Sequence, residues 1–123
     1  RYSNANAMIG QASGLPEAAD ALGVYYLTQG ETSKALNAFG SAKTNNAALA
    51  QILAKDYSAA RTTLSSIPNP DATTYYLTAV LGARQKNENM VMSNLRQAVR
   101  LDPSLLGRAK NDLEFASYNL SYL

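Results

Sequence analysis

The segment LGVYYLTQGETSKALNAFGSA, from Leu22 to Ala42, decides the fold that we expect for this chain. Its apolar positions recur at helical spacing on both sides of Gly30, a residue type that readily takes the left-handed conformation that ends a helix. The segment therefore predicts two antiparallel helices, the first over residues 16–29 and the second beginning shortly after Gly30. Small Gly23 lets the two helices approach closely, and large Phe39 fills the contact. Such a hairpin cannot bury its apolar face alone, so it must stack on neighbouring hairpins.

The pattern Leu-Gly-x-x-Tyr at residues 22–26, followed by Ala-x-x-x-Phe at residues 35–39, resembles the tetratricopeptide repeat (TPR) family. The resemblance implies an all-α fold, an α-solenoid of stacked antiparallel helical hairpins that winds into a right-handed superhelix. It also implies that the first helix of each repeat lines a concave groove, which receives a peptide or a helix of a partner protein. The first repeat covers residues 16–49.

A second, shortened repeat occupies residues 45–70. Its turn and second helix are carried by Asp56, Ala60 and Leu64, with Asp56 as the helix cap. Ala60 follows Ala35 by only 25 residues, whereas the period of the family is about 34 residues. The missing residues must fall in the first helix of this repeat, so we expect a short helix over residues 45–54.

The third repeat covers residues 71–103 and begins after a turn that contains Pro68 and Pro70, which prevent helix continuation. Its end, Leu-x-x-Ala-x-x-Leu-Asp-Pro at residues 95–103, resembles the end of a repeat in the same family. A C-terminal capping helix is expected over residues 103–120, because apolar residues recur there at helical spacing. These residues are Leu106, Ala109, Leu113, Ala116 and Leu120.

The beginning of the chain, residues 1–14, is expected to be an arm or the remnant of an upstream helix. Residues 1–123 together are expected to form a single TPR-like domain. The first residue is Arg1, which indicates a processed or excised segment. Richness in Asn and Ser without cysteine favours the periplasm or cell envelope over the cytoplasm.

Composition excludes several classes of function. Cysteine and histidine are both absent, which removes disulfides, thiol nucleophiles, the imidazole base and the commonest ligands of transition metals. We therefore expect no metal and no cofactor. Nothing resembles a phosphate-binding loop or a nucleophile–base pair, so the chain is not expected to be an enzyme. A net charge of +2 from scattered basic residues argues against nucleic acid, and no apolar stretch reaches the ~18 residues of a membrane span.

The resemblance also implies which residues line the groove. In this sequence they are Asp20, Val24, Leu27, Leu49, Tyr76, Val80 and Arg84. This set is apolar with few charges, so the expected ligand is an apolar or aromatic segment of another protein. Some family members grip a C-terminal carboxylate with Lys, Arg and Asn, but the corresponding places hold other residues here. Those residues are Glu17, Asp20, Val24, Thr73 and Tyr76.

Several alternatives remain open at this point. The second tyrosine of each pair, Tyr25-Tyr26 and Tyr75-Tyr76, fits interhelical packing as well as ligand contact. Arg84 fits a solvated charge at a helix end, and Glu17 with Asp20 fits complementarity to the helix dipole better than a metal site. The chain could also be a structural spacer or assembly joint within a larger repeat-containing protein, self-associating through exposed end helices. A more remote alternative is an accessory carbohydrate-binding domain.

Overall fold

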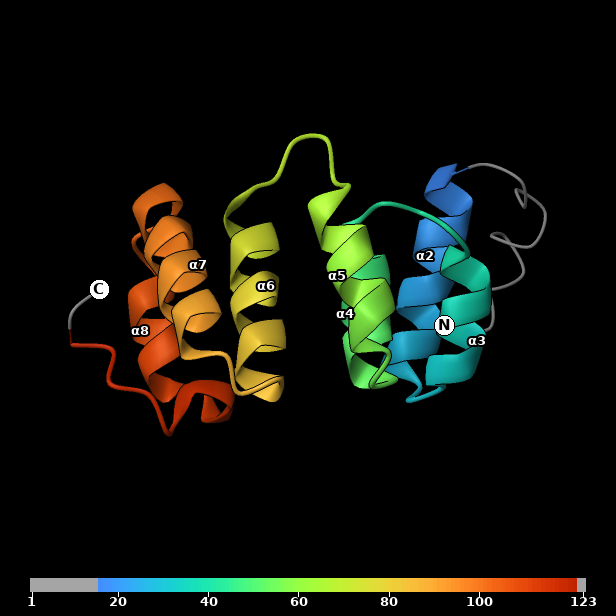
Figure 1. The fold of residues 1–123 in the computed structure, drawn as a ribbon. Coiled ribbons are helices and arrows are strands. Elements are labelled where there is room, and N and C mark those ends of the chain that lie inside the picture. Colours follow the sequence, from blue (N-terminus) through green and yellow to red (C-terminus); the bar gives the residue numbers. More distant parts are fainter. Residues whose placement is uncertain (1–15, 122–123) are drawn as a thin grey trace. The chain divides into compact units, whose positions relative to one another are not determined.

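The computed structural model describes residues 16–121, and in this range every regular element is a helix (Figure 1). The α-helices are α2 (Pro16–Thr28), α3 (Thr32–Phe39), α4 (Asn45–Leu53), α5 (Tyr57–Ser65), α6 (Ala72–Arg84), α7 (Glu88–Leu101) and α8 (Leu105–Asn111), followed by a 3-10 turn, η1 (Leu113–Phe115). The expected all-α class is confirmed. The expectation for residues 1–14 lies outside the described residues.

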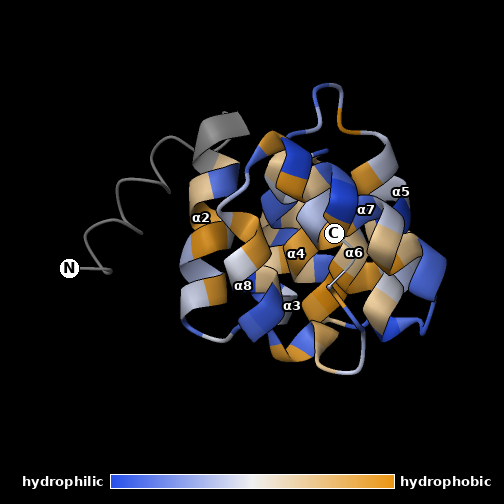
Figure 2. Ribbon diagram, turned by 90° about the vertical axis from the view of Figure 1, so that its left-hand side faces the viewer, coloured by the Kyte–Doolittle hydropathy of each residue, from blue (hydrophilic) through white to orange (hydrophobic). Residues whose placement is uncertain are grey.

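The chain divides into two compact units between Ser66 and Ile67. Unit 1 contains α2 to α5, and unit 2 contains α6 to α8 with η1. Hydrophobic and hydrophilic residues both occur along the helix ribbons (Figure 2). None of the helices in the described range is long and apolar enough to cross a membrane.

The first hairpin of unit 1, α2 with α3, is closed by the contact between Gly23 and Phe39. A Cβ atom placed on Gly23 would lie 2.4 Å from the Phe39 ring, far inside van der Waals contact. Phe39 belongs to a buried cluster with Ala35, Ala47 and Ala50, against which partly buried apolar side chains pack. The predicted close approach at Gly23 is confirmed.

The second hairpin of unit 1, α4 with α5, packs on the first because α4 contacts both α2 and α3. Helix α4 has nine residues where α2 has thirteen, which confirms the predicted shortening. Ile52 is buried on its inner side, whereas Leu53 is 46% exposed. Stacking of one hairpin on the next therefore holds within unit 1.

The hairpin turns of the two units share one geometry. Each turn has a residue with positive φ two positions before the first residue of the second helix: Gly30 (73°), Lys55 (63°) and Lys86 (57°). The next backbone N–H then donates to the carbonyl five residues earlier. These bonds are Glu31 to Tyr26 at 2.9 Å, Asp56 to Gln51 at 2.9 Å and Asn87 to Gly82 at 2.8 Å. This is the Schellman motif, which satisfies carbonyl groups at a helix end.

The second helices share their buried positions as well as their turns. The residues five and nine positions after each positive-φ residue are buried. They are Ala35 and Phe39 in α3, Ala60 and Leu64 in α5, and Val91 and Leu95 in α7. The three hairpins are thus local copies of one design, although only α2 to α5 lie in the same unit.

Unit 2 ends differently from the prediction. Helix α8 stops at Asn111, so the expectation of one helix over residues 103–120 was wrong. Asp112 has an extended backbone, with φ −83° and ψ 125°, and its carboxylate accepts the backbone N–H of Glu114, which starts η1. Leu113, expected on the buried stripe, is 90% exposed, and Phe115 is buried in its place at 2%. Asp112 also accepts the Tyr76 hydroxyl of α6, a contact that it makes from this extended backbone.

Candidate functional site

The expected groove residues of unit 1 lie on α2 and α4. Val24 and Leu27 are half-buried and pack against the cluster around Phe39, and Leu49 is half-buried. The Asp20 carboxylate accepts hydrogen bonds from the Asn46 side-chain amide at 3.2 and 3.5 Å. This contact joins α2 to α4, the first helices of the two hairpins in unit 1. The apolar side chains Val24, Leu27 and Leu49 stay partly accessible.

The expected groove residues of unit 2 lie on α6, where the chain's own C-terminal segment, residues 112–121, covers part of the helix. Tyr76 is only 4% exposed and Val80 8%. The turn η1 contacts α6, and α8 contacts α7. A partner that binds this face of α6 has to displace the C-terminal segment.

Tyr76 is the centre of these contacts. Its hydroxyl donates to the Asp112 carboxylate at 2.6 Å, and its ring meets the Phe115 ring edge to face, with centroids 5.5 Å apart. The Arg108 guanidinium lies over the same ring, 5.0 Å from the centroid. Burial, and then the hydrogen bond to Asp112, raises the pKa of Tyr76 well above its usual range, so the hydroxyl stays a donor at physiological pH.

Arg84 binds Glu114, the second acidic residue of the C-terminal segment. Its Nε and Nη2 atoms donate to the two carboxylate oxygens of Glu114 at 3.1 and 2.8 Å, a bidentate pair. The two side chains are 27% and 30% exposed. Solvent therefore screens the pair, which contributes at most about 1 kcal/mol, but its two-pronged geometry selects a carboxylate.

Sequence reasoning missed Asp112, Glu114 and Phe115 as partners of α6. They were assigned to a continuing helix, because residues 106–120 carry a helical apolar spacing. The one available signal was the pair of acids at residues 112 and 114, whose spacing of two does not fit one face of a helix.

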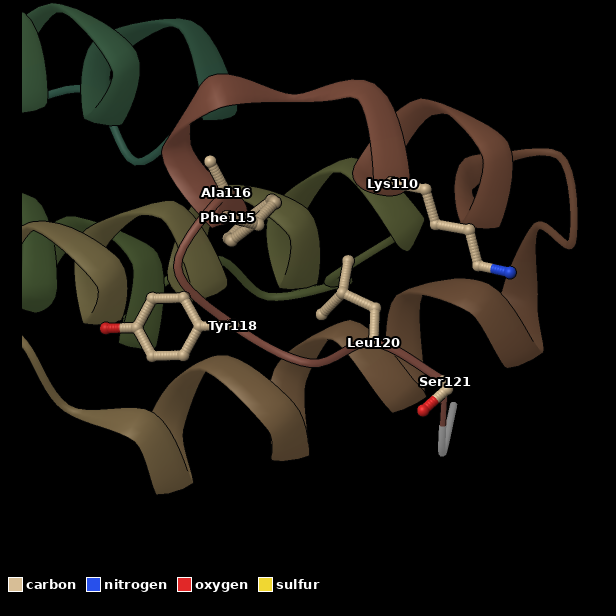
Figure 3. Close-up of a pocket in the computed structure, with 6 residues that line it drawn as sticks. All are labelled: Lys110, Phe115, Ala116, Tyr118, Leu120 and Ser121. Carbon is tan, nitrogen blue, oxygen red and sulfur yellow. The ribbon is translucent and has the colours of Figure 1, made fainter.

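A shallow cavity of about 190 Å³ opens beside the same segment (Figure 3). Lys110 comes from α8, and the other lining residues come from η1 and the chain after it. Phe115 and Leu120, both buried, supply its apolar part. The cavity lies at the edge of the C-terminal segment and has both apolar and polar lining residues.

Side chains that could ligate a metal ion are not clustered in the described part of the chain. Within residues 16–121 no three acidic side chains converge as a metal site would require. Lys34, next to Ser33 in sequence, pairs with Glu31 at 3.1 Å.

Comparison of the chain with protein-family models, with curated proteins and with solved structures finds no match.

Proposed function

We propose that this protein is a non-catalytic scaffold of the tetratricopeptide type, an α-solenoid of helical hairpins that binds a peptide or helix of a partner protein. The observation that carries the proposal is the repetition of one hairpin design. The left-handed residue, the bond across five residues and the two buried positions that follow recur in α2–α3, α4–α5 and α6–α7. In repeats of this kind the buried side chains pack against neighbouring repeats, and the stack presents extended surfaces to partners.

The partly exposed apolar side chains of α2 and α4 support binding in unit 1. Val24, Leu27 and Leu49 are half-buried and keep some accessibility, and Val24 and Leu27 pack against the core cluster around Phe39. A partner that covers them gains about 25 cal/mol for each Å² of apolar surface removed from water. We therefore assign unit 1 an apolar or aromatic ligand segment.

A capture experiment tests this function. A photo-crosslinking residue in place of Leu49 should trap a partner in an extract of the native organism, and Leu49→Glu should lose the same partner in a pull-down. Asn37→Glu, on the exposed side of α3, is the matched control and should retain it. Both variants need unfolding curves beside the unaltered chain. Capture that survives Leu49→Glu in a folded chain argues against a binding surface on α2 and α4.

The second candidate function is that of an assembly joint, and exposed leucines in unit 2 favour it. Leu101 is 54% exposed at the end of α7, and Leu113 projects from η1. Sedimentation over a range of concentrations tests this role. A joint should associate, and Leu101→Gln with Leu113→Gln should abolish the association.

A further inference from the structure

The segment that covers α6 makes its contacts in a pattern. Asp112 and Glu114 each give a carboxylate to α6, Phe115 gives a buried ring, and Leu113 between them faces water. Each of these contacts joins one side chain to another, so none of them depends on the backbone that connects the segment to α8. A separate peptide with the same side chains can make the same contacts.

The receiving surface has matching chemistry. The Tyr76 hydroxyl donates to the first acid, and the Arg84 guanidinium forks onto the second. The Tyr76 ring packs against the aromatic residue on its edge and meets the Arg108 guanidinium over its face. The Arg84 guanidinium and the Tyr76 phenol donor opposite two carboxylates form a charge-complementary site, and the ring contact adds an apolar anchor.

We propose that this surface of α6 and α8 is a recognition site for an acidic–aromatic segment of a partner protein, with the pattern Asp-x-Glu-Phe. Residues 112–115 of the chain occupy the site until such a partner displaces them. The inference rests on the proposed binding function and specifies the ligand chemistry of its unit 2 part.

The covalent connection of residues 112–115 to the rest of the chain explains why they fill the site, although a partner can still displace them. A segment joined to its site by a short connection acts at an effective concentration in the millimolar range, so a free peptide competes poorly with it. When the resident segment is weakened, the open fraction rises and the apparent affinity for a competing peptide rises in proportion. A loosened chain, in which substitutions weaken the contacts of residues 112–115, is therefore the variant in which peptide binding is easiest to detect.

The experiment uses the full chain with Glu114→Gln and Phe115→Ala, together with a fluorescent peptide of residues 109–121 in the unaltered sequence. We expect saturable binding, measured by anisotropy, at least tenfold tighter than binding of the peptide to the unaltered chain. Adding Arg84→Glu should abolish the binding. A peptide that carries Glu114→Arg should restore it, because the charges are then exchanged across the same pair.

Two results would overturn the proposal: no binding to a loosened chain that still unfolds cooperatively, or binding that Arg84→Glu leaves unchanged. If the loosened chain does not fold, Glu114→Arg alone in the full chain replaces it, since this change repels Arg84 and keeps Phe115. In that case the probe is the peptide with its own Glu114, and failure to bind has the same meaning.

Measuring the oligomeric state tests whether the segment that occupies the site comes from a partner protein or from a second copy of this chain. A dimer of the unaltered chain that Arg84→Glu dissociates would make a second copy the occupant and overturn the assignment to a partner protein. Failure of these tests leaves the capture experiment at Leu49 unaffected, because that position lies in unit 1.

Discussion

At the scale of single residues, Gly23 is a position where an added side chain meets a buried ring. Its missing Cβ leaves room for the Phe39 ring, which is itself buried and cannot swing away. We expect Gly23→Leu to lower the free energy of unfolding by ~1–3 kcal/mol through overpacking. Urea denaturation followed by circular dichroism measures the change.

The matched control is Gly107→Leu in α8, where a Cβ atom meets nothing within 4 Å. Leucine is a better helix former than glycine, so this variant should be unchanged or more stable by up to about 1 kcal/mol. Equal losses at both positions would contradict the assignment of Gly23 to a close helix contact.

Tyr76 gives the unfolding free energy a dependence on alkaline pH. Because the pKa of its hydroxyl is raised in the folded chain, the unfolded state loses this proton first as pH rises past about 10. The contribution of Tyr76 is fully present below that pH and declines above it. Denaturation at pH 8 and at pH 11 should show a loss of stability that becomes smaller in Tyr76→Phe. An identical loss in the two chains would contradict the link to this hydroxyl.

At the scale of elements, two of the three hairpin turns hold a lysine in the left-handed conformation. Lys86 has φ 57°, a region that costs a residue with a Cβ atom about 1–2 kcal/mol. We expect Lys86→Gly to raise the free energy of unfolding by about 0.5–1 kcal/mol, after allowance for the added freedom of glycine in the unfolded chain. Chemical denaturation measures the gain.

The neighbouring position supplies the control for this turn. Gln85 has an ordinary φ of −94°, so Gln85→Gly relieves no strain and should cost about 0.5–1 kcal/mol. If both glycine variants lose stability, the positive φ at Lys86 carries no strain.

The elements also show which parts of the fold a sequence can predict. The hairpins and the short α4 were predictable, because a turn residue, a small residue and a large residue lie within one local stretch. The end of α8 was not, because Asp112 and Glu114 beyond it contact Tyr76 and Arg84, which lie 36 and 30 residues away in the sequence. For the same reason the resemblance predicts Tyr76 and Arg84 as groove residues but does not identify Asp112 and Glu114 as their partners within the chain.

At the scale of the whole molecule, the two units are joined by a largely exposed link. Ser66, Pro68 and Asn69 are exposed and lie outside any helix. Limited proteolysis should therefore cut between residues 65 and 71 before it cuts the connection of α3 to α4, which lies inside unit 1. Mass spectrometry of the first fragments decides the order. An earlier cut at residues 40–44 would contradict the division.

The exposed Leu113 has a practical consequence for spectroscopy. The chain contains no cysteine, so Leu113→Cys creates a unique thiol, at a position that is 90% exposed and flanked by two anchored acids. A nitroxide attached there tumbles with the body of unit 2 while its neighbours are held, and freely once they are released. The line shape of its electron paramagnetic resonance spectrum then reports, in solution and without a binding partner, what fraction of molecules have let go of their own C-terminal segment.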